Sequence, residues 1–497
     1  MSDCLHRCRV EVIEAHDRIN RNNRNDGIDR IDRIDRAQPG EADPETLPDL
    51  LRVAAQADPR ETLFYWERPE NGEAMLGIGC AHDVRTAGRD RLEDANREAL
   101  ATLAKVEVEY VGGAGRSGAP RFVGGFGFGS EPPAARTWRE FPSCRFFLPT
   151  TLWTIADGRA HRATTTACAA GSGDCEPRAV DPAGQAERHI ACEADLDEHE
   201  RWRTRVNEVL SMIEQGVAEK VVLSRSRTIV SESSNRSTIE VIDRLRRTRP
   251  GCYTFWFRAG ETDFIGSSPE LLVARNGDTV ETEALAGTSA RGQTREDDAR
   301  RASRLVDSMK DRREQSTVTR AIAETLEPIT ERLDIGEKPS VMVLPEAFHL
   351  HTPIRGILAV PTSALGLAGM LHPTPAVCGS PQEVAFEVLE SQEADRGWYT
   401  GAIGWLGDGG DGRFAVALRS ALIDGSEATV WAGAGIVDGS DPDAEFAETE
   451  IKMKAMGTAF GEPREERPPA RSIARRRAAA SVPGGATETL IPVEAEG

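Results

Sequence analysis

Residues 252–285 read CYTFWFRAGETDFIGSSPELLVARNGDTVETEAL and contain four short apolar segments in succession. The segments CYTFWFRA, DFIG, ELLVARNG and DTVETEAL are separated by turn residues, a pattern typical of consecutive strands. Later segments, GWYTGAIGWLGD and RFAVALRSALIDG, also look like paired strands. Because strand runs with interspersed helices lack regular strand–helix–strand alternation, we expect an α+β fold with large antiparallel sheets.

The chain of 497 residues divides into four stretches by composition. Residues 1–49 include a short polar repeat, DRINRNNRNDGIDRIDRIDR, that cannot bury a core and predicts disorder. Residues 50–193 carry strand-like pieces between glycine-rich turns, and we interpret them as the N-terminal part of the α+β fold. Residues 194–460 show the clearest patterning, and residues 461–497 predict a second disordered segment.

The composition is strongly acidic, with 81 Asp and Glu against 61 Lys and Arg and a net charge of -20. Phosphate binding needs a basic face, so nucleic acid and anionic membranes are not expected partners. Abundant acidic residues with few lysines are typical of proteins from salt-loving organisms. The nine cysteines form no CxxC pair, and no apolar run of about 18 residues is present. We therefore expect reduced thiols and a cytoplasmic protein.

Lys220 opens an apolar segment in AEKVVLSRSR, residues 218–227, and is one of only six lysines. Burial disfavours the charged form of a lysine, so Lys220 could act as a general base, which arginine cannot do. Seen alone, a lysine at a strand end more often reaches out to water.

Glu270 lies on a Ser-Ser-Pro turn in IGSSPELL, between two apolar segments. Partial burial there would raise the pKa of its carboxyl group and suit it to donating a proton. A turn residue that faces solvent explains the spacing equally well. The segment ETEALAGTSARG places Gly287 and Thr288 in a small-residue turn whose N–H groups could approach an anion, a weak signal by itself.

Two pairs of acidic residues occur at helical spacing. Asp311 and Glu314 lie on a long charged helix predicted from about residue 296 to 326, and Glu445 and Glu448 lie on a closing helix. Carboxylates that converge from two helices suit a hard cation such as Mg²⁺. In a chain this acidic, coincidence is a serious rival explanation.

Arg419 alternates with small residues in RFAVALRSA, so that a continuous strand would place it on one face with Ala415, Ala417 and Ala421. A wall of small side chains leaves room for a planar anion held by a bidentate pair. A strand arginine facing solvent is at least as common.

Nine blocks of sequence resemble the chorismate-utilising enzymes when they are taken together and in order. They are KVVLSR, GSSPELL, ALAGTSARG, KDRREQ, HLHT, LHPTPAVCG, GWYTGAIGW, VALRSA and GAGIVDGSDPDAEFAET. The resemblance is closest to the isochorismate synthases and dense over residues 194–460, which would be the chorismate-binding catalytic region. It implies two layered, largely antiparallel β-sheets flanked by helices, with the active site between them.

The resemblance also implies a role for each matching residue. Lys220 would activate a water that attacks carbon 2 of chorismate, and Glu270 would protonate the departing hydroxyl on carbon 4. Glu314 and Glu448 would bind Mg²⁺, with Asp311 and Glu445 acting next to them or through water. The residues expected to contact the substrate are Gly287, Thr288, His349, Ala376, Tyr399, Arg419 and Gly435.

Within the family, two features favour water over ammonia as the nucleophile. Lys220 is present, and Ala286 stands where aminodeoxychorismate synthases carry a lysine. We therefore expect an Mg²⁺-dependent isomerase that supplies menaquinone or siderophore synthesis, without a glutaminase subunit and as a monomer. A salicylate synthase and a catalytically silent chorismate-binding homologue remain alternatives. The usual Glu-His of the family reads Glu314-Gln315 here.

Overall fold

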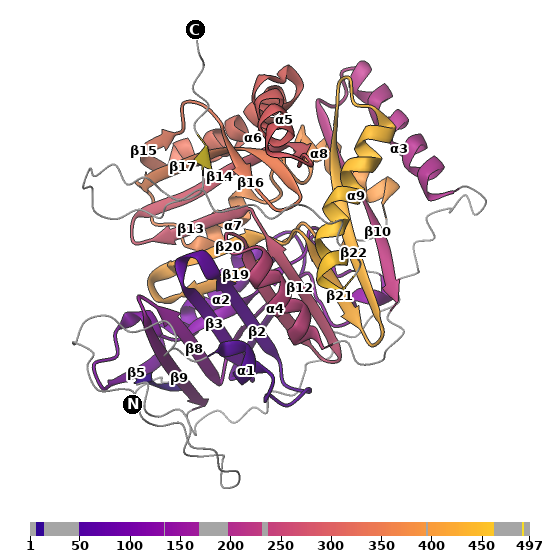
Figure 1. Cartoon of the computed structure of the whole chain (residues 1–497). Coiled ribbons are helices and arrows are strands. Elements are labelled where there is room, and N and C mark those ends of the chain that lie inside the picture. Colours follow the sequence, from indigo (N-terminus) through magenta and orange to yellow (C-terminus); the bar gives the residue numbers. More distant parts are fainter. Residues whose placement is uncertain are drawn as a thin grey trace.

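The computed structural model describes residues 6–13, 49–133, 135–167, 197–230, 237–393, 396–461 and 490–491. The described strands form two large sheets, and helices cover them (Figure 1). All strand pairs are antiparallel except β1 with β5. The expected α+β fold with two layered antiparallel sheets is confirmed.

One sheet has 12 strands among the described residues. In spatial order they are β18 Gly379–Ser380, β10 Lys220–Val230, β22 Glu427–Val437, β21 Ser420–Asp424, β12 Thr262–Ser268, β11 Tyr253–Ala259, β2 Leu63–Arg68, β3 Glu73–Ile78, β8 Thr151–Ala156, β9 Arg159–Ala167, β1 His6–Ile13 and β5 Val106–Val111. Strands from both halves of the chain therefore form one sheet.

The second sheet has 11 described strands. In order they are β23 Leu490–Ile491, β16 Ser340–Val343, β17 Ala347–Leu358, β14 Thr279–Ala290, β13 Leu271–Asn276, β20 Gly412–Val416, β19 Ala402–Gly407, β6 Arg121–Phe126, β7 Cys144–Leu148 and β4 His82–Thr86, with β15 Thr330–Ile335 paired to β17.

The described helices lie on the outer faces and at the ends of the sheets (Figure 1). They are α1 Leu50–Ala54, α2 Arg91–Leu103, α3 Glu198–Glu214, α4 Thr238–Thr248, α5 Arg295–Asp307, α6 Met309–Leu326, α7 Ala364–Leu371, α8 Gln382–Gln392 and α9 Pro442–Ala459. Short 3₁₀ turns are η3 Pro69–Asn71, η4 Arg116–Gly118, η5 Arg136–Trp138, η6 Glu327–Ile329 and η7 Asp408–Gly410. Helix α6 packs on β14 and α9 packs on β22. No described helix is long and apolar enough to cross a membrane.

The chain crosses between the sheets within the opening segment of the sequence analysis. The four predicted strands form as β11, β12, β13 and β14, but β12 belongs to the 12-stranded sheet and β13 to the 11-stranded sheet. Pro269 and Glu270 are the two residues between them. Glu270 therefore lies where the chain passes from one sheet to the other.

A second crossing corrects the strand expected around Arg419. That segment is two strands, β20 in one sheet and β21 in the other, and Arg419 lies between them with a left-handed φ of 48°. The face shared with Ala415, Ala417 and Ala421 in a continuous strand is therefore wrong. Alternation of small residues in the sequence gives no signal for a residue with a positive φ, such as the one that ends this strand.

Two other expectations also change. The long helix predicted over about 296–326 is two helices, because Ser308 leaves the helical conformation with ψ of 117° and its hydroxyl accepts the N–H of Asp311 to cap α6. Disorder over residues 1–49 is wrong for His6–Ile13, which forms β1 between β9 and β5. Residues 14–48 lie outside the described part. In the expected C-terminal disordered segment, Leu490 and Ile491 pair with β16.

An aromatic core fastens the two sheets together. Phe257 on β11 is fully buried, and its ring lies 5.7 Å from that of Phe147 on β7 and 5.2 Å from that of Trp398, which precedes β19. Burial of aromatic area between the sheets therefore holds the two layers together.

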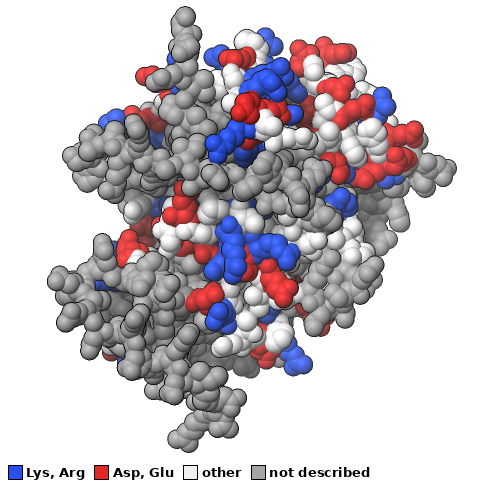
Figure 2. Space-filling view, in the orientation of Figure 1, with Lys and Arg blue, Asp and Glu red and all other residues white. Residues whose placement is uncertain are grey.

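On the surface, acidic and basic side chains are interspersed over the face shown in Figure 2.

We predict that Phe257→Ala destabilises the protein by about 3–5 kcal/mol, since it leaves a large cavity between the sheets. The free energy of unfolding in urea measures the loss. Val230→Ala, at the exposed end of β10 where Val230 is 63 % exposed, should change that energy by no more than about 0.5 kcal/mol. Equal losses in the two variants would contradict this role for the core.

Candidate functional site

Lys220 begins β10 and lies inside the protein rather than at its surface. It is 2 % exposed, and its Nζ lies 2.8 Å from Glu314 Oε1 on α6. Gly435 on β22 packs against both side chains, because a Cβ there would lie 2.8 Å from Lys220 Cε and 2.9 Å from Glu314 Oε1. The structure therefore brings Lys220, Glu314 and Gly435 together, and a side chain at position 435 would have to displace the ion pair from this arrangement.

Both predicted metal-site glutamates on α9 also pair with a lysine. Glu448 Oε1 lies 2.6 Å from Lys452 Nζ, and Glu445 Oε1 lies 2.7 Å from Lys310 Nζ. Lys452 also donates to the carbonyl oxygen of Gly433 at 2.8 Å. Three of the six lysines in the chain thus pair with carboxylates that the sequence analysis singled out.

The pKa shifts show that these carboxylates are close to one another. Burial would raise the pKa of Glu314, but the lysine ammonium groups, above all Lys220, outweigh it and lower the pKa. Burial raises the pKa of Asp311, and the negative charges of Glu314 and Glu448 raise it further. Burial and Glu448 likewise raise the pKa of Glu445. The structure therefore gathers the four predicted carboxylates from α6 and α9 into one cluster.

The cluster has the right chemistry for a hard cation, since oxygen ligands from two helices suit Mg²⁺. In the arrangement seen here, no three His, Cys, Asp or Glu side chains of the described residues converge closely enough to hold a metal ion. The ammonium groups of Lys220, Lys310 and Lys452 neutralise the carboxylates instead. A metal ion would have to compete with these lysines for the same oxygens.

Glu270 is buried at the first crossing between the sheets, with 4 % of its surface exposed. Burial raises the pKa of its carboxyl group to about 8, and the negative charge of Glu283 adds to the shift against the opposing effects of Lys220, Arg419 and Lys452. Glu270 is therefore a neutral acid at neutral pH, which is the state that a proton donor requires.

Arg419, at the second crossing, is linked to the bulge in β14 through His349. Arg419 Nη2 lies 3.1 Å from His349 Nε2, and His349 Nδ1 lies 3.1 Å from the Gly287 carbonyl oxygen and 3.3 Å from Thr288 Oγ1. Burial lowers the pKa of His349 well below its usual range, and the nearby positive charges of Arg419 and Lys452 lower it further. In a neutral ring, Nδ1–H donates to the carbonyl and Nε2 accepts from Arg419, a tautomer that we assign from this network.

Gly287 connects this group to the carboxylate cluster. Its φ is 69°, and a Cβ there would lie 3.0 Å from Asp311 Cβ. The register of β14 with β17 shifts between Ala286 and Thr288, so Gly287 is the extra residue of a bulge. The bulge therefore lets the backbone pass close to α6.

A buried arginine that the sequence analysis missed holds the segments that carry Tyr399 and Ala376. Arg396 pairs with Glu393 and donates to the carbonyl oxygens of Val222 on β10 and Val377, next to Ala376. Tyr399 is buried and stacks on Trp431 with ring centroids 6.1 Å apart. Burial raises the pKa of Tyr399 to about 12, so it stays a neutral phenol.

Gln315 is the residue that departs from the family pattern, and its side-chain NH₂ group donates two hydrogen bonds. Its Nε2 lies 2.9 Å from the Ala284 carbonyl oxygen and 2.9 Å from Thr352 Oγ1. These bonds tie α6 to the paired residues Ala284 of β14 and Thr352 of β17, on the same side of the bulge at Gly287. The amide therefore performs a positioning role next to Glu314.

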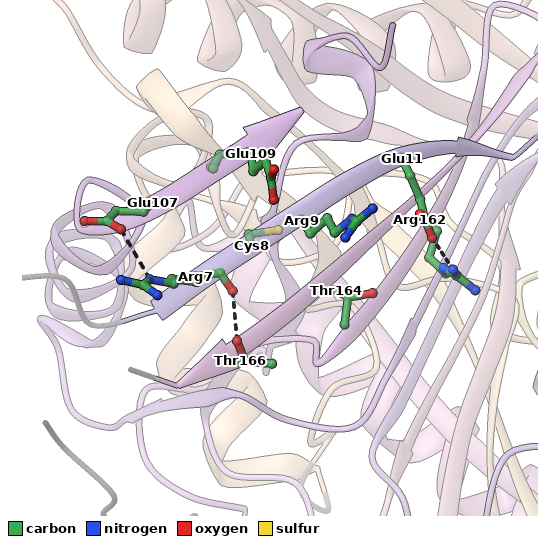
Figure 3. Close-up of a pocket in the computed structure, with 10 residues that line it drawn as sticks. Arg7, Cys8, Arg9, Glu11, Glu107, Glu109, Arg162, Thr164 and Thr166 are labelled. Carbon is green, nitrogen blue, oxygen red and sulfur yellow. Dashed lines mark hydrogen bonds and ion pairs between the residues drawn. The ribbon is translucent and has the colours of Figure 1, made fainter. Parts of the chain in front are cut away.

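A separate surface hollow lies on β1, β5 and β9 (Figure 3). Its lining includes Arg7 and Arg162, which pair with Glu107 at 3.4 Å and with Glu11. None of the candidate residues lines it. We assign no function to this hollow.

We predict that Glu270→Gln makes the stability of the protein less sensitive to pH. An acid whose pKa rises from 4.5 to about 8 on folding binds more protons in the folded state between those values, so stability falls as pH rises through that window. The amide side chain of the variant does not titrate, so this loss of stability with rising pH should disappear. Urea unfolding of both proteins across the window measures it, and parallel pH profiles would contradict the raised pKa.

The chain matches the family model described as chorismate binding enzyme over residues 42–461. It is 34 % identical to the salicylate biosynthesis isochorismate synthase of Pseudomonas aeruginosa, over 83 % of this chain and 88 % of that protein. It is 31 % identical to the isochorismate synthase MenF of Bacillus subtilis, over 80 % and 88 % of the two chains. The solved structure of MenF, the menaquinone-specific isochorismate synthase from Escherichia coli, is 26 % identical with a TM-score of 0.67, covering 83 % of this chain and 91 % of that one. With its two-layer fold, its buried Lys220 and Glu270 and the family-model match over residues 42–461, this chain belongs to the chorismate-binding enzyme family.

Proposed function

We propose that this protein is an isochorismate synthase, an isomerase that adds water at carbon 2 of chorismate and expels the hydroxyl group from carbon 4. The observation that carries the proposal is that a buried lysine, Lys220, and a buried neutral acid, Glu270, lie close enough for the charge of the first to act on the pKa of the second. The family match and the names of the similar proteins support the same reaction.

Two residues would handle the protons of the reaction. Lys220 takes a proton from the attacking water, and Glu270, neutral because its pKa is about 8, gives its proton to the departing hydroxyl, which leaves as water. Burial around both groups keeps other water away from the site. Arg419, oriented through His349, is placed to hold a substrate carboxylate by paired hydrogen bonds.

Glu314 has two alternative partners in this proposal. It can neutralise the ammonium group of Lys220, as it does here, or bind a cation together with Glu448. Lys220 becomes a base more readily once Glu314 no longer stabilises its charged form. Mg²⁺ bound at Glu314 and Glu448, with Asp311 and Glu445 beside it or reaching it through water, would neutralise the ring carboxylate of the substrate.

The destination of the product follows only by analogy with the relatives. MenF of Escherichia coli is described as menaquinone-specific, and the Pseudomonas protein is named for salicylate biosynthesis. We propose supply of isochorismate to menaquinone or siderophore synthesis, by a cytoplasmic monomer that needs no glutaminase subunit. A salicylate synthase, which also removes pyruvate, is the second candidate.

Product identification tests the proposal. Incubation with chorismate and Mg²⁺ should yield isochorismate, and Lys220→Ala should lower kcat by about 10²–10⁴-fold because it removes the base. The variant should still bind chorismate. Salicylate plus pyruvate from the natural protein would favour the second candidate, and unchanged chorismate at low and at molar salt would indicate a silent homologue.

Calorimetric titration with Mg²⁺ alone tests the metal proposal. Glu448→Gln should weaken Mg²⁺ binding by at least about tenfold, since loss even of an outer partner of a metal site has that effect. Glu324→Gln, on α6 where the side chain is 70 % exposed, provides the control and should bind Mg²⁺ as the natural protein does. Equal affinity in the natural protein and the Glu448 variant would remove Glu448 from the metal site.

A further inference from the structure

Glu283 is a buried acidic residue for which the proposed reaction has no role. It lies on β14, two residues from the half-buried Glu281 and on the same face of the strand. Its neighbour Ala284 packs on the opposite side, in the cluster that includes Val318 and Ile322 of α6. Glu283 raises the pKa of Tyr253 on β11 of the other sheet. Glu283 therefore points into the space between the sheets, where Glu270 lies.

Both carboxylate oxygens of Glu283 have hydrogen-bond partners. The backbone N–H of Leu271 donates to Oε1 at 2.6 Å, and His351 Nε2 lies 2.8 Å from Oε2. Leu271 is the residue directly after Glu270, so the first of these bonds fixes the backbone that carries the proton donor. The Leu271 amide and the His351 ring therefore fix the position of this buried carboxyl group.

The charge of Glu283 acts directly on Glu270. After burial, it is the largest influence that raises the pKa of Glu270. Three cationic groups oppose it from other elements: Lys220 on β10, Arg419 between β20 and β21, and Lys452 on α9. Without a nearby negative charge, these cations would favour the ionised form of the donor.

We propose that Glu283 is a positioning residue for the proton donor: its carboxylate anchors the backbone beside Glu270, and its charge opposes a second negative charge there. The inference rests on the proposed role of Glu270 as the acid of the isochorismate synthase reaction. Glu283 touches no substrate atom in this scheme. It acts through Glu270, with His351 holding it from β17.

Infrared difference spectra test the electrostatic part without any substrate. In the ligand-free protein with a chelator, the band of the protonated Glu270 carboxyl, identified by its loss in Glu270→Gln, is titrated with pH. In Glu283→Gln its midpoint should fall by about one pH unit, as expected for the loss of one nearby charge. Glu281→Gln, which removes a surface glutamate paired with Arg355, should leave the midpoint unchanged.

Glu283→Asp separates the effect of the charge from the effect of the side chain's position. It also provides the test if Glu283→Gln does not fold. The aspartate keeps the charge, so the midpoint should stay at its natural value or above. Its shorter side chain cannot reach both Leu271 and His351, so kcat should fall about tenfold or more through misplacement of the donor. In an active enzyme, the high-pH limb of kcat/KM should also move to lower pH in Glu283→Gln.

The outcomes distinguish this inference from the proposed function. The role of Glu283 would be overturned if the titration midpoint of the Glu270 band were unchanged in Glu283→Gln. It would also be overturned if Glu283→Asp kept the kcat of the natural protein. If the natural protein makes no isochorismate, the product test fails while the infrared shift still occurs, because that shift needs no chorismate.

Discussion

The chain passes twice from one sheet to the other, and each passage leaves a single charged or acidic side chain between the layers. Glu270 lies between β12 and β13, and Arg419 lies between β20 and β21. Neither residue has the freedom of a loop side chain, because strands of both sheets fix the backbone on either side. The aromatic rings around Phe257 pack between the layers and fix their spacing. Precise placement of the two groups thus follows from the topology of the sheets.

Charges buried between the layers need partners, and this requirement explains the unusual use of lysine. A buried unpaired charge is very costly, and three of the four cluster carboxylates pair with an ammonium group: Glu314 with Lys220, Glu445 with Lys310 and Glu448 with Lys452. Arginine serves as the cation almost everywhere else in the chain. In the proposed reaction Lys220 would release Glu314 to the metal ion and then lose a proton, whereas an arginine keeps its proton at any accessible pH.

Local patterns in the sequence predicted the parts of the fold and site that depend on local chemistry. The strands from 252 to 285 and the strand that begins at Lys220 form as expected. The turn expected at Glu270 is instead a crossing: Ser267 and Ser268 end β12, and the chain passes to the other sheet with Glu270 buried. The roles of the site residues come from the family resemblance, and the structure shows only that most of them lie together.

Features that depend on distant contacts were not predictable in the same way. The left-handed backbone at Arg419 breaks a strand whose alternation looked continuous. The cap at Ser308, which divides one charged helix into two, is by contrast a local signal that the sequence analysis missed, since the Ser308 hydroxyl accepts the N–H of Asp311. Glu283 and Arg396 act on partners far away in the sequence, His351 and Val222, so spacing gave no signal for them. For Lys310 and Lys452 a signal did exist, namely the rarity of lysine in this chain.

The central claim is that Glu270 is a neutral acid while Glu314, the partner of Lys220, is an ionised carboxylate. A neutron crystal structure of the ligand-free protein near neutral pH observes these protons directly. We predict a deuteron on the carboxyl group of Glu270 and none on Glu314, in line with a pKa of about 8 for the first and a lowered pKa for the second. An ionised Glu270, or a protonated Glu314, would contradict the claim.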